Sequence, residues 1–122
     1  MTGFCNGILT AMITPFTDNG VNFEEFGKMI EYQIEGGTDA LVVLGTTGEP
    51  ATMTEDEKTE TIKFAVKKAA GRIKIIVGTG SNNTAKAVAA SVQAEKLGAD
   101  GVLAVTPYYN KCTQKGLFDY YK

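Results

Sequence analysis

The feature of the sequence that most constrains its fold is a series of short apolar runs that recur at intervals of about 30 residues, the size of one βαβ unit. These runs have the composition of buried strands and occupy residues 8–13, 40–44, 75–77 and 102–105. An amphipathic segment separates each run from the next. Such alternation predicts an α/β fold with a parallel sheet and right-handed crossover connections.

Capping signals mark the starts of the helices between these strands. Asn22 with Glu25, and Thr54 with Glu57, have the spacing of a capping box, in which each side chain bonds the backbone N–H of the other residue. A third helix is expected over residues 84–97.

In the third helix, Val88 and Val92 stand at helical spacing, which places both on one face. Gly98 follows as a stop signal. A fourth helix is expected to begin near Thr113, shortly before the last residue of the sequence, Lys122.

A functional site is expected at one edge of the predicted sheet. Parallel α/β folds bind ligands beyond the carboxyl ends of their strands, where loops and helix N-termini present free backbone N–H groups. In this chain the four ends have the sequences TPFTDNG, GTTGEPATM, GTGSNNT and TPYYNK, which are rich in hydroxyl, amide and glycine groups. The connections at the opposite edge, EGGTD, AAGRIK and LGADG, are typical of ordinary turns.

The GTTGE segment is the first candidate site. Thr46 and Thr47 place two hydroxyls and several backbone N–H groups at a strand end, an arrangement that suits a small carboxylate. A tight turn in which the threonines bond their own backbone fits the same residues equally well. The residues alone leave both interpretations open.

The GTGSNN segment, residues 78–83, partly matches a dinucleotide-binding motif, with Asp100 as the acidic partner. The third glycine is absent, however, and Asp100 precedes the next strand instead of following it. A glycine turn with Asn83 capping the third helix is therefore favoured. In TPYYNK, the rings of Tyr108 and Tyr109 would point to opposite sides of an extended segment, and exposed tyrosines of this kind are enriched at protein interfaces.

Composition excludes several functions. The 12 basic and 14 acidic residues are scattered, so no nucleic-acid footprint is present, and the absence of histidine excludes a Ser-His-Asp triad or an imidazole metal site. No apolar run is long enough to span a membrane and no signal peptide is evident, so a cytoplasmic location is expected. Cys5 and Cys112 are expected to be reduced and to lie at opposite ends of the fold, with no metal bound.

The sequences AMITPF, GTTGE, GTGSNNT and VTPYYNK, in this order, resemble the dihydrodipicolinate synthase family, also called 4-hydroxy-tetrahydrodipicolinate synthase. The resemblance covers essentially all 122 residues. Other pyruvate-dependent aldolases, such as N-acetylneuraminate lyase, usually carry serine in place of Thr46 and lack the VTPYYN sequence. The resemblance therefore favours the synthase over an N-acetylneuraminate lyase-like alternative.

This resemblance implies a (β/α) TIM barrel, of which residues 1–122 match the N-terminal half: a four-stranded parallel (βα)4 half-barrel that ends near the start of the fourth helix. It also implies a class I aldolase-type enzyme without a separate cofactor, in which pyruvate forms a Schiff base with a lysine. The resulting enamine condenses with aspartate 4-semialdehyde, on the route to lysine and diaminopimelate. The full-length family implies a homo-oligomer, typically a tetramer.

Individual residues match roles in the family. Thr46 matches the hydroxyl of a proton relay that also contacts the substrate, and Thr47 matches a ligand of the pyruvate carboxylate. Tyr109 matches the tyrosine that reaches into the neighbouring subunit's site. Asn82 and Tyr108 keep the pattern of an effector region at the subunit interface that binds lysine.

The chain also departs from the family. In the effector region, Lys86 replaces an acidic residue. Residues 1–122 match the N-terminal half of the family's barrel, and the resemblance implies that the Schiff-base lysine lies in the other half. Lys111 lies at the expected edge but in a loop, where little would lower the pKa of its amine, while Lys74 and Arg72 lie at the opposite edge. Two hypotheses follow: a chain that carries part of an enzyme's active site, or a non-catalytic, self-associating half-barrel.

Overall fold

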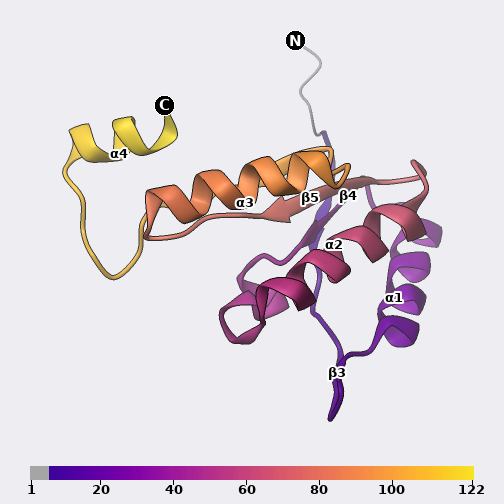
Figure 1. Ribbon diagram of the computed structural model, residues 1–122. Coiled ribbons are helices and arrows are strands. Elements are labelled where there is room, and N and C mark those ends of the chain that lie inside the picture. The colour runs from indigo at the N-terminus through magenta and orange to yellow at the C-terminus, as the bar shows by residue number, and fades with distance from the viewer. Residues whose placement is uncertain (1–5) are drawn as a thin grey trace.

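The computed structural model describes residues 6–122 and contains one four-stranded sheet with strand order β1-β4-β5-β6 (Figure 1). The strands are β1 Leu9–Ala11, β4 Ala40–Val43, β5 Lys74–Gly78 and β6 Gly101–Leu103. Every neighbouring pair is parallel, and Leu41 of β4 lies in register with Thr10 of β1 and Ile75 of β5. The predicted parallel sheet is confirmed, although β1 and β6 are shorter than the apolar runs that predicted them.

Three helices connect the strands of this sheet and pack against one of its faces. They are α1 Phe23–Glu35, α2 Glu55–Ala69 and α3 Thr84–Lys96. Phe26 of α1, Ala65 of α2 and Ala94 of α3 belong to the same buried cluster as Leu41 and Ile75. Because all three helices contribute to one cluster with alternate residues of the sheet, they cover the same face, as right-handed crossovers require.

The other face of the sheet carries a smaller cluster. Ala40, Val42 and Ile76 form it, and none of the helices α1, α2 and α3 contributes a residue. Leu9 lies in register with Ala40, and Leu103 lies in register with Gly78. Both leucines therefore point to this face, where they are 40% and 47% exposed.

The helix caps agree with the sequence signals in most respects. Thr54 and Glu57 form a complete capping box, and the bonds from the backbone N–H and hydroxyl of Thr54 hold the pKa of the Glu57 carboxyl below its usual value. The side chain of Asn22 accepts a bond from the backbone N–H of Glu25. The second half of that box does not form, because the Glu25 carboxylate pairs with Lys28 at 2.7 Å.

Val88 and Val92 share one face of the third helix, as their spacing predicted, but this face is not the buried one. Val88 and Val92 are 56% and 42% exposed, and it is Ala87 and Ala94 that α3 buries. The small alanine side chains let the helix lie close to the sheet, and the valines consequently face away from it.

Two further local elements are a hairpin that was not predicted and a turn at GTTGE, which was one of the two interpretations of that segment. A short hairpin follows β1 and consists of β2 Phe16–Thr17 and β3 Gly20–Val21. Gly20 has a φ of 110°, which suits glycine in a tight reversal. The other element is a pair of 3-10 turns after β4, described below.

The fourth predicted helix is confirmed as α4 Gln114–Tyr121, with the side chain of Thr113 accepting a bond from the N–H of Gly116. Figure 1 shows α4 standing apart from the sheet at the end of a long loop. Two tyrosine hydroxyls attach it: Tyr120 accepts a bond from the N–H of Ser81, and Tyr121 donates to the carbonyl of Ala104. No helix among the described residues is long and apolar enough to cross a membrane.

The amino edge of the sheet contains the turns expected there, and two aspartate side chains form additional hydrogen bonds to the backbone. The carboxylate of Asp39 accepts a bond from the N–H of Ile8 at 2.7 Å, and that of Asp100 accepts one from the N–H of Ile75 at 2.8 Å. Asp39 lies just before β4 and holds the start of β1, and Asp100 lies just before β6 and holds the start of β5. Asp100 therefore has a structural role at the edge opposite to any dinucleotide site.

Candidate functional site

The GTTGE segment forms a compact turn at the carboxyl end of β4. Its first part is a 3-10 turn, Thr46–Gly48, followed by a second, Pro50–Thr52. The N–H groups of Gly48 and Glu49 bond back to the carbonyls of Gly45 and Thr46. Thr46 and Thr47 are exposed, and within residues 6–122 no hydrogen bond occupies their N–H groups. The turn therefore offers two N–H groups and two hydroxyls to a ligand.

Neighbouring strand ends hold this turn from both sides. On the β1 side, the hydroxyl of buried Thr14 donates to the carbonyl of Gly48 at 2.8 Å. On the β5 side, the carbonyl of Leu44 lies where a Cβ at position 78 would be, so only glycine fits there. Leu44 itself has a φ of 57°, an unusual conformation for a buried leucine. Backbone strain of this kind is concentrated at functional sites.

The GTG loop follows β5 and forms the next part of the edge. The N–H of Thr79 bonds the carbonyl of Leu103, and the hydroxyls of Thr79 and Ser91 lie 2.9 Å apart. Asn83 caps α3 by accepting a bond from the N–H of Lys86, as predicted. Asn82 and the side chain of Lys86 are exposed at the start of the helix.

The two tyrosines after β6 are both exposed. Tyr108 is 54% exposed and Tyr109 is 94% exposed. The assumption that this segment is extended is wrong, because Tyr109 has a φ of 66° and the N–H of Asn110 bonds the carbonyl of Tyr108 in a tight turn. No hydrogen bond links Tyr109 to Thr46 within the described part of the chain. The structure thus places both residues at the carboxyl edge without joining them.

The basic residues lie as the sequence predicted. Lys111 is exposed in the loop after β6, and Lys74 begins β5 at the amino edge. Arg72 is engaged elsewhere: its guanidinium makes two bonds of 2.8 Å to the Glu31 carboxylate. These bonds, with a further one from Lys68, lower the pKa of the Glu31 carboxyl to about 2, and the bonds to Glu31 raise the pKa of Arg72.

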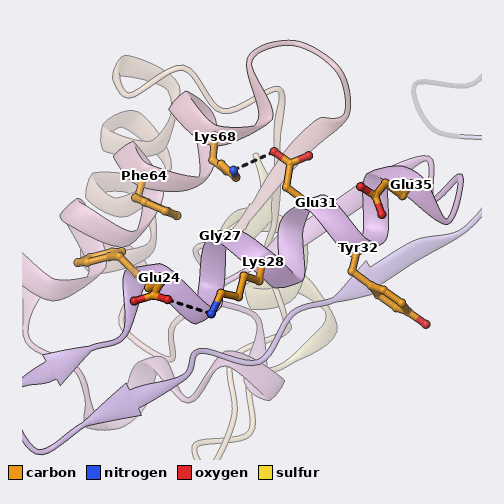
Figure 2. A pocket seen from close by; sticks show the side chains of 9 residues that line it. Glu24, Gly27, Lys28, Glu31, Tyr32, Glu35, Phe64 and Lys68 are labelled. Carbon is orange, nitrogen blue, oxygen red and sulfur yellow. Dashed lines mark ion pairs between the residues drawn. The ribbon is translucent and has the colours of Figure 1, made fainter.

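One hollow of the described surface lies away from the carboxyl edge. Figure 2 shows it between α1 and α2, and its lining includes Phe64 and Gly27 together with several charged side chains. Two of its carboxylates are already paired, Glu24 with Lys28 and Glu31 with Lys68. Because the lysines of this hollow are already engaged by its own carboxylates, we assign the candidate site to the loops at the strand ends.

The remaining expectations concern thiols and metals. Cys112 is free and exposed in the loop before α4. Cys5 lies outside the described residues, so the expected separation of the two thiols stays a prediction. Within residues 6–122 there is no cluster of three or more side chains of the kinds that commonly bind metals.

Sequence reasoning found the exposed threonines and tyrosines of this edge but missed the roles of Thr14 and Leu44. Thr14 is the first residue of the TPFTDNG strand end. Its hydroxyl suggested a functional role, but the sequence did not indicate its hydrogen-bond partner. Nothing in the local sequence marks Leu44, because its conformation depends on the glycine at position 78.

Comparison with known proteins identifies relatives of this structure. The model of the dihydrodipicolinate synthetase family matches residues 4–122. The 4-hydroxy-tetrahydrodipicolinate synthase of Thermoanaerobacter sp. (strain X514) is 59% identical over 107 residues, which are 88% of this chain and 36% of that protein. The chain spans 36–40% of the length of the curated relatives it matches.

Solved structures give the same result. The crystal structure of dihydrodipicolinate synthase from Aquifex aeolicus has a TM-score of 0.92 and 52% identity, over 95% of this chain and 40% of that one. A protein described as the first monomeric dihydrodipicolinate synthase variant has a TM-score of 0.94 and 47% identity, over 97% of this chain and 39% of that one.

Proposed function

The chain belongs to the dihydrodipicolinate synthetase family, and from this premise we propose that it supplies the N-terminal half of a barrel that condenses pyruvate with aspartate 4-semialdehyde. Its sheet of four parallel strands with helices on one face is half of the (β/α) barrel that the sequence predicted. The observation that carries the proposal is the exposed Thr46–Gly48 turn, which lies at the edge where such barrels place their sites.

In this proposal the turn binds the carboxylate of pyruvate. The outward N–H groups of Thr46 and Thr47, together with the Thr47 hydroxyl, are donors of the kind that a small carboxylate accepts. The Thr46 hydroxyl passes a proton, because a hydroxyl donates and accepts a hydrogen bond at the same time. The products enter lysine and diaminopimelate synthesis, and the enzyme acts in the cytoplasm.

The exposure of Tyr109 supports a role outside its own subunit. A ring that is 94% exposed contacts little of its own chain and is available to a neighbour. We propose that Tyr109 completes the proton relay of a second subunit in a homo-oligomer, with a tetramer as the family's usual assembly. Tyr108, Asn82 and Lys86 would then lie in the effector region between subunits.

The lysine that forms the imine with pyruvate is proposed to lie outside this half of the barrel. Within the described residues, Lys111 is the lysine that stands in the loops of the carboxyl edge, and it is exposed to solvent. Water around an exposed amine stabilises its charged form, whereas imine formation needs the neutral amine. Lys111 therefore lacks the desolvation that prepares a lysine for imine formation.

Trapping with borohydride tests this assignment. The 122-residue chain is incubated with pyruvate and borohydride, and its intact mass is measured. We expect no specific adduct, because the chain lacks a desolvated lysine at the site. A stoichiometric adduct that disappears in Lys111→Arg would show that the chain forms the imine by itself. The same treatment of a complete enzyme containing this sequence is expected to modify one lysine beyond residue 122.

A second candidate function is a non-catalytic, self-associating half-barrel that binds small carboxylates weakly. The exposed leucines of the helix-free face favour it, since apolar side chains on a sheet face drive association. Absence of an adduct together with a defined oligomer of the 122-residue chain would support this function for the chain alone.

A further inference from the structure

Thr14 makes a buried contact that none of the roles above uses. It follows β1, its residue is only 4% exposed, and its hydroxyl donates to the carbonyl of Gly48 at 2.8 Å. A buried hydroxyl without a partner would be costly, so this bond is firmly determined. It joins the first strand end of the sheet to the turn after β4.

The carbonyl of Gly48 that accepts this bond helps to determine the conformation of the turn. The peptide unit that contains the carbonyl of Gly48 also contains the N–H of Glu49, which closes the 3-10 turn by bonding the carbonyl of Thr46. Fixing one end of a planar peptide unit fixes the other. The hydroxyl of Thr14 therefore orients the group that closes the turn.

The turn needs such support because its ends are unfavourable. Leu44 before it and Glu49 after it both have a φ of 57°, in the left-handed region that residues with a side chain rarely adopt. Conformations of this kind persist only where the surroundings hold them. At Leu44 the support comes from the close fit against Gly78, and at Glu49 the adjacent contact is the bond from Thr14.

We propose that Thr14 is a positioning residue, which holds the Thr46–Gly48 turn in the shape that directs the N–H groups of Thr46 and Thr47 toward a carboxylate. The inference rests on the proposed function for its ligand. Thr14 itself does not touch the ligand and acts through the carbonyl of Gly48.

The test compares Thr14→Val, which removes the hydroxyl at nearly constant shape, with Thr14→Ser, which keeps it. Thr61→Val is a matched control: Thr61 is fully buried in α2, and its hydroxyl bonds the carbonyl of Glu57 at 2.7 Å, away from the strand ends. Amide hydrogen exchange of Glu49 and NMR titration with pyruvate are measured on the 122-residue chain. Thr14→Ala replaces Thr14→Val if the valine variant does not fold.

Thr14→Val is expected to accelerate exchange of the Glu49 amide about tenfold and to weaken the pyruvate-dependent shifts of Thr46 and Thr47 about fivefold in affinity. Thr14→Ser restores both, and Thr61→Val changes neither, although it lowers the melting temperature comparably. Unchanged Glu49 exchange in Thr14→Val overturns the proposal, and so does faster exchange with unchanged affinity.

The two proposals fail in different ways. If pyruvate shifts no amide of the unmodified chain, the assigned carboxylate site is wrong, and the ligand part of this inference is overturned with it. Whether Thr14 holds the turn is still decided by the exchange of the Glu49 amide, which requires no ligand.

Discussion

At the scale of single residues, the candidate site depends on one strained position and the glycine opposite it. A left-handed conformation costs a residue such as Leu44 about 1–2 kcal/mol. It is retained here because the carbonyl of Leu44 fits against Gly78, where a Cβ would overlap it. The glycine that ends β5 therefore determines the path of the chain after β4, although the two strands are distant in sequence.

Replacing Gly78 by alanine is expected to destabilise the chain by about 2 kcal/mol, the typical cost of overpacking. Gly78 does not have a positive φ, so the penalty is steric. Gly37→Ala is the contrasting variant: its φ is 78° in open space, and the expected cost of about 1 kcal/mol is conformational. Urea unfolding measures both. Equal losses in the two variants would contradict the steric argument at Gly78.

Lys86 is predicted to prevent inhibition of the complete enzyme by lysine at physiological concentrations. In the effector region that the family resemblance implies, Lys86 stands where an acidic residue would pair with the ligand's ammonium group. The structure leaves this side chain exposed in the first turn of α3, beside Asn82. A like charge at that point disfavours the ligand.

Steady-state kinetics of a complete enzyme containing this sequence, with added lysine, test the prediction. The unmodified enzyme should be insensitive, and Lys86→Glu should introduce inhibition. Strong inhibition of the unmodified enzyme that persists in Lys86→Ala would show that the charge at this position does not control the site.

At the scale of elements, α1 and α2 are joined by an ion-pair network on the surface away from the site. Glu31 of α1 accepts bonds from Arg72, just after α2, and from Lys68 within it, and Figure 2 shows the Lys68 pair beside the hollow. Below this network, Gly27 lets Phe64 approach α1 closely. The charges and the close approach together set how the two helices lie against each other.

The network predicts a dependence of stability on pH. The pKa of Glu31 falls from 4.5 to about 2 in the folded chain, so the folded state binds the proton less readily than the unfolded state. The stabilisation by Glu31 is therefore complete above about pH 4.5 and is lost as the pH falls toward 2. Glu31→Gln should remove this part of the acid-induced loss, as measured by urea unfolding at a series of pH values.

Salt provides the control for this effect. Glu31 and its partners are partly exposed, with side-chain exposures of 32–45%, so added salt should weaken the difference between the unmodified chain and Glu31→Gln. An identical acid dependence of the two proteins at low salt would contradict a stabilising role for the network.

The elements also show how far a sequence can be interpreted without its structure. Strand and helix positions and the caps at Thr54 and Asn83 followed from local patterns, because those patterns depend on neighbouring residues. The buried face of α3 did not follow from the sequence, because two valines at helical spacing resemble a buried stripe, although alanines make the contact. The bond from Thr14 to Gly48 links residues 34 positions apart, and no local pattern predicts such a pairing.

At the scale of the whole molecule, the sheet has two outer strands and an uncovered face. β1 and β6 are the outer strands of the described sheet, and Leu9 and Leu103 are partly exposed on its helix-free face. Ile13 and Val105, which follow these strands, are also exposed. Outer strands and apolar faces of this kind favour association.

The 122-residue chain is predicted to form a homodimer or a larger oligomer. A two-fold axis along the strands would bring β6 of each copy beside β1 of the other, so that one operation pairs all the outer strands. Light scattering at micromolar concentration should show the assembly, and Leu103→Lys should weaken it. Val88→Lys, on the exposed face of α3, should not. A monodisperse monomer of the unmodified chain would contradict this arrangement.

The aspartates at the amino edge bear on how the chain is made. Asp39, just before β4, holds the start of β1, and Asp100, just before β6, holds the start of β5, so in these two cases a later segment fastens a strand that the ribosome has already released. Domains begin to fold from their N-terminal parts during synthesis. The start of β1 leaves the ribosome first, and its bond forms only after Asp39 has been translated, 31 residues after Ile8. The two bonds therefore favour sequential growth of the sheet, in which β1 is secured when Asp39 has emerged and β5 when Asp100 has emerged.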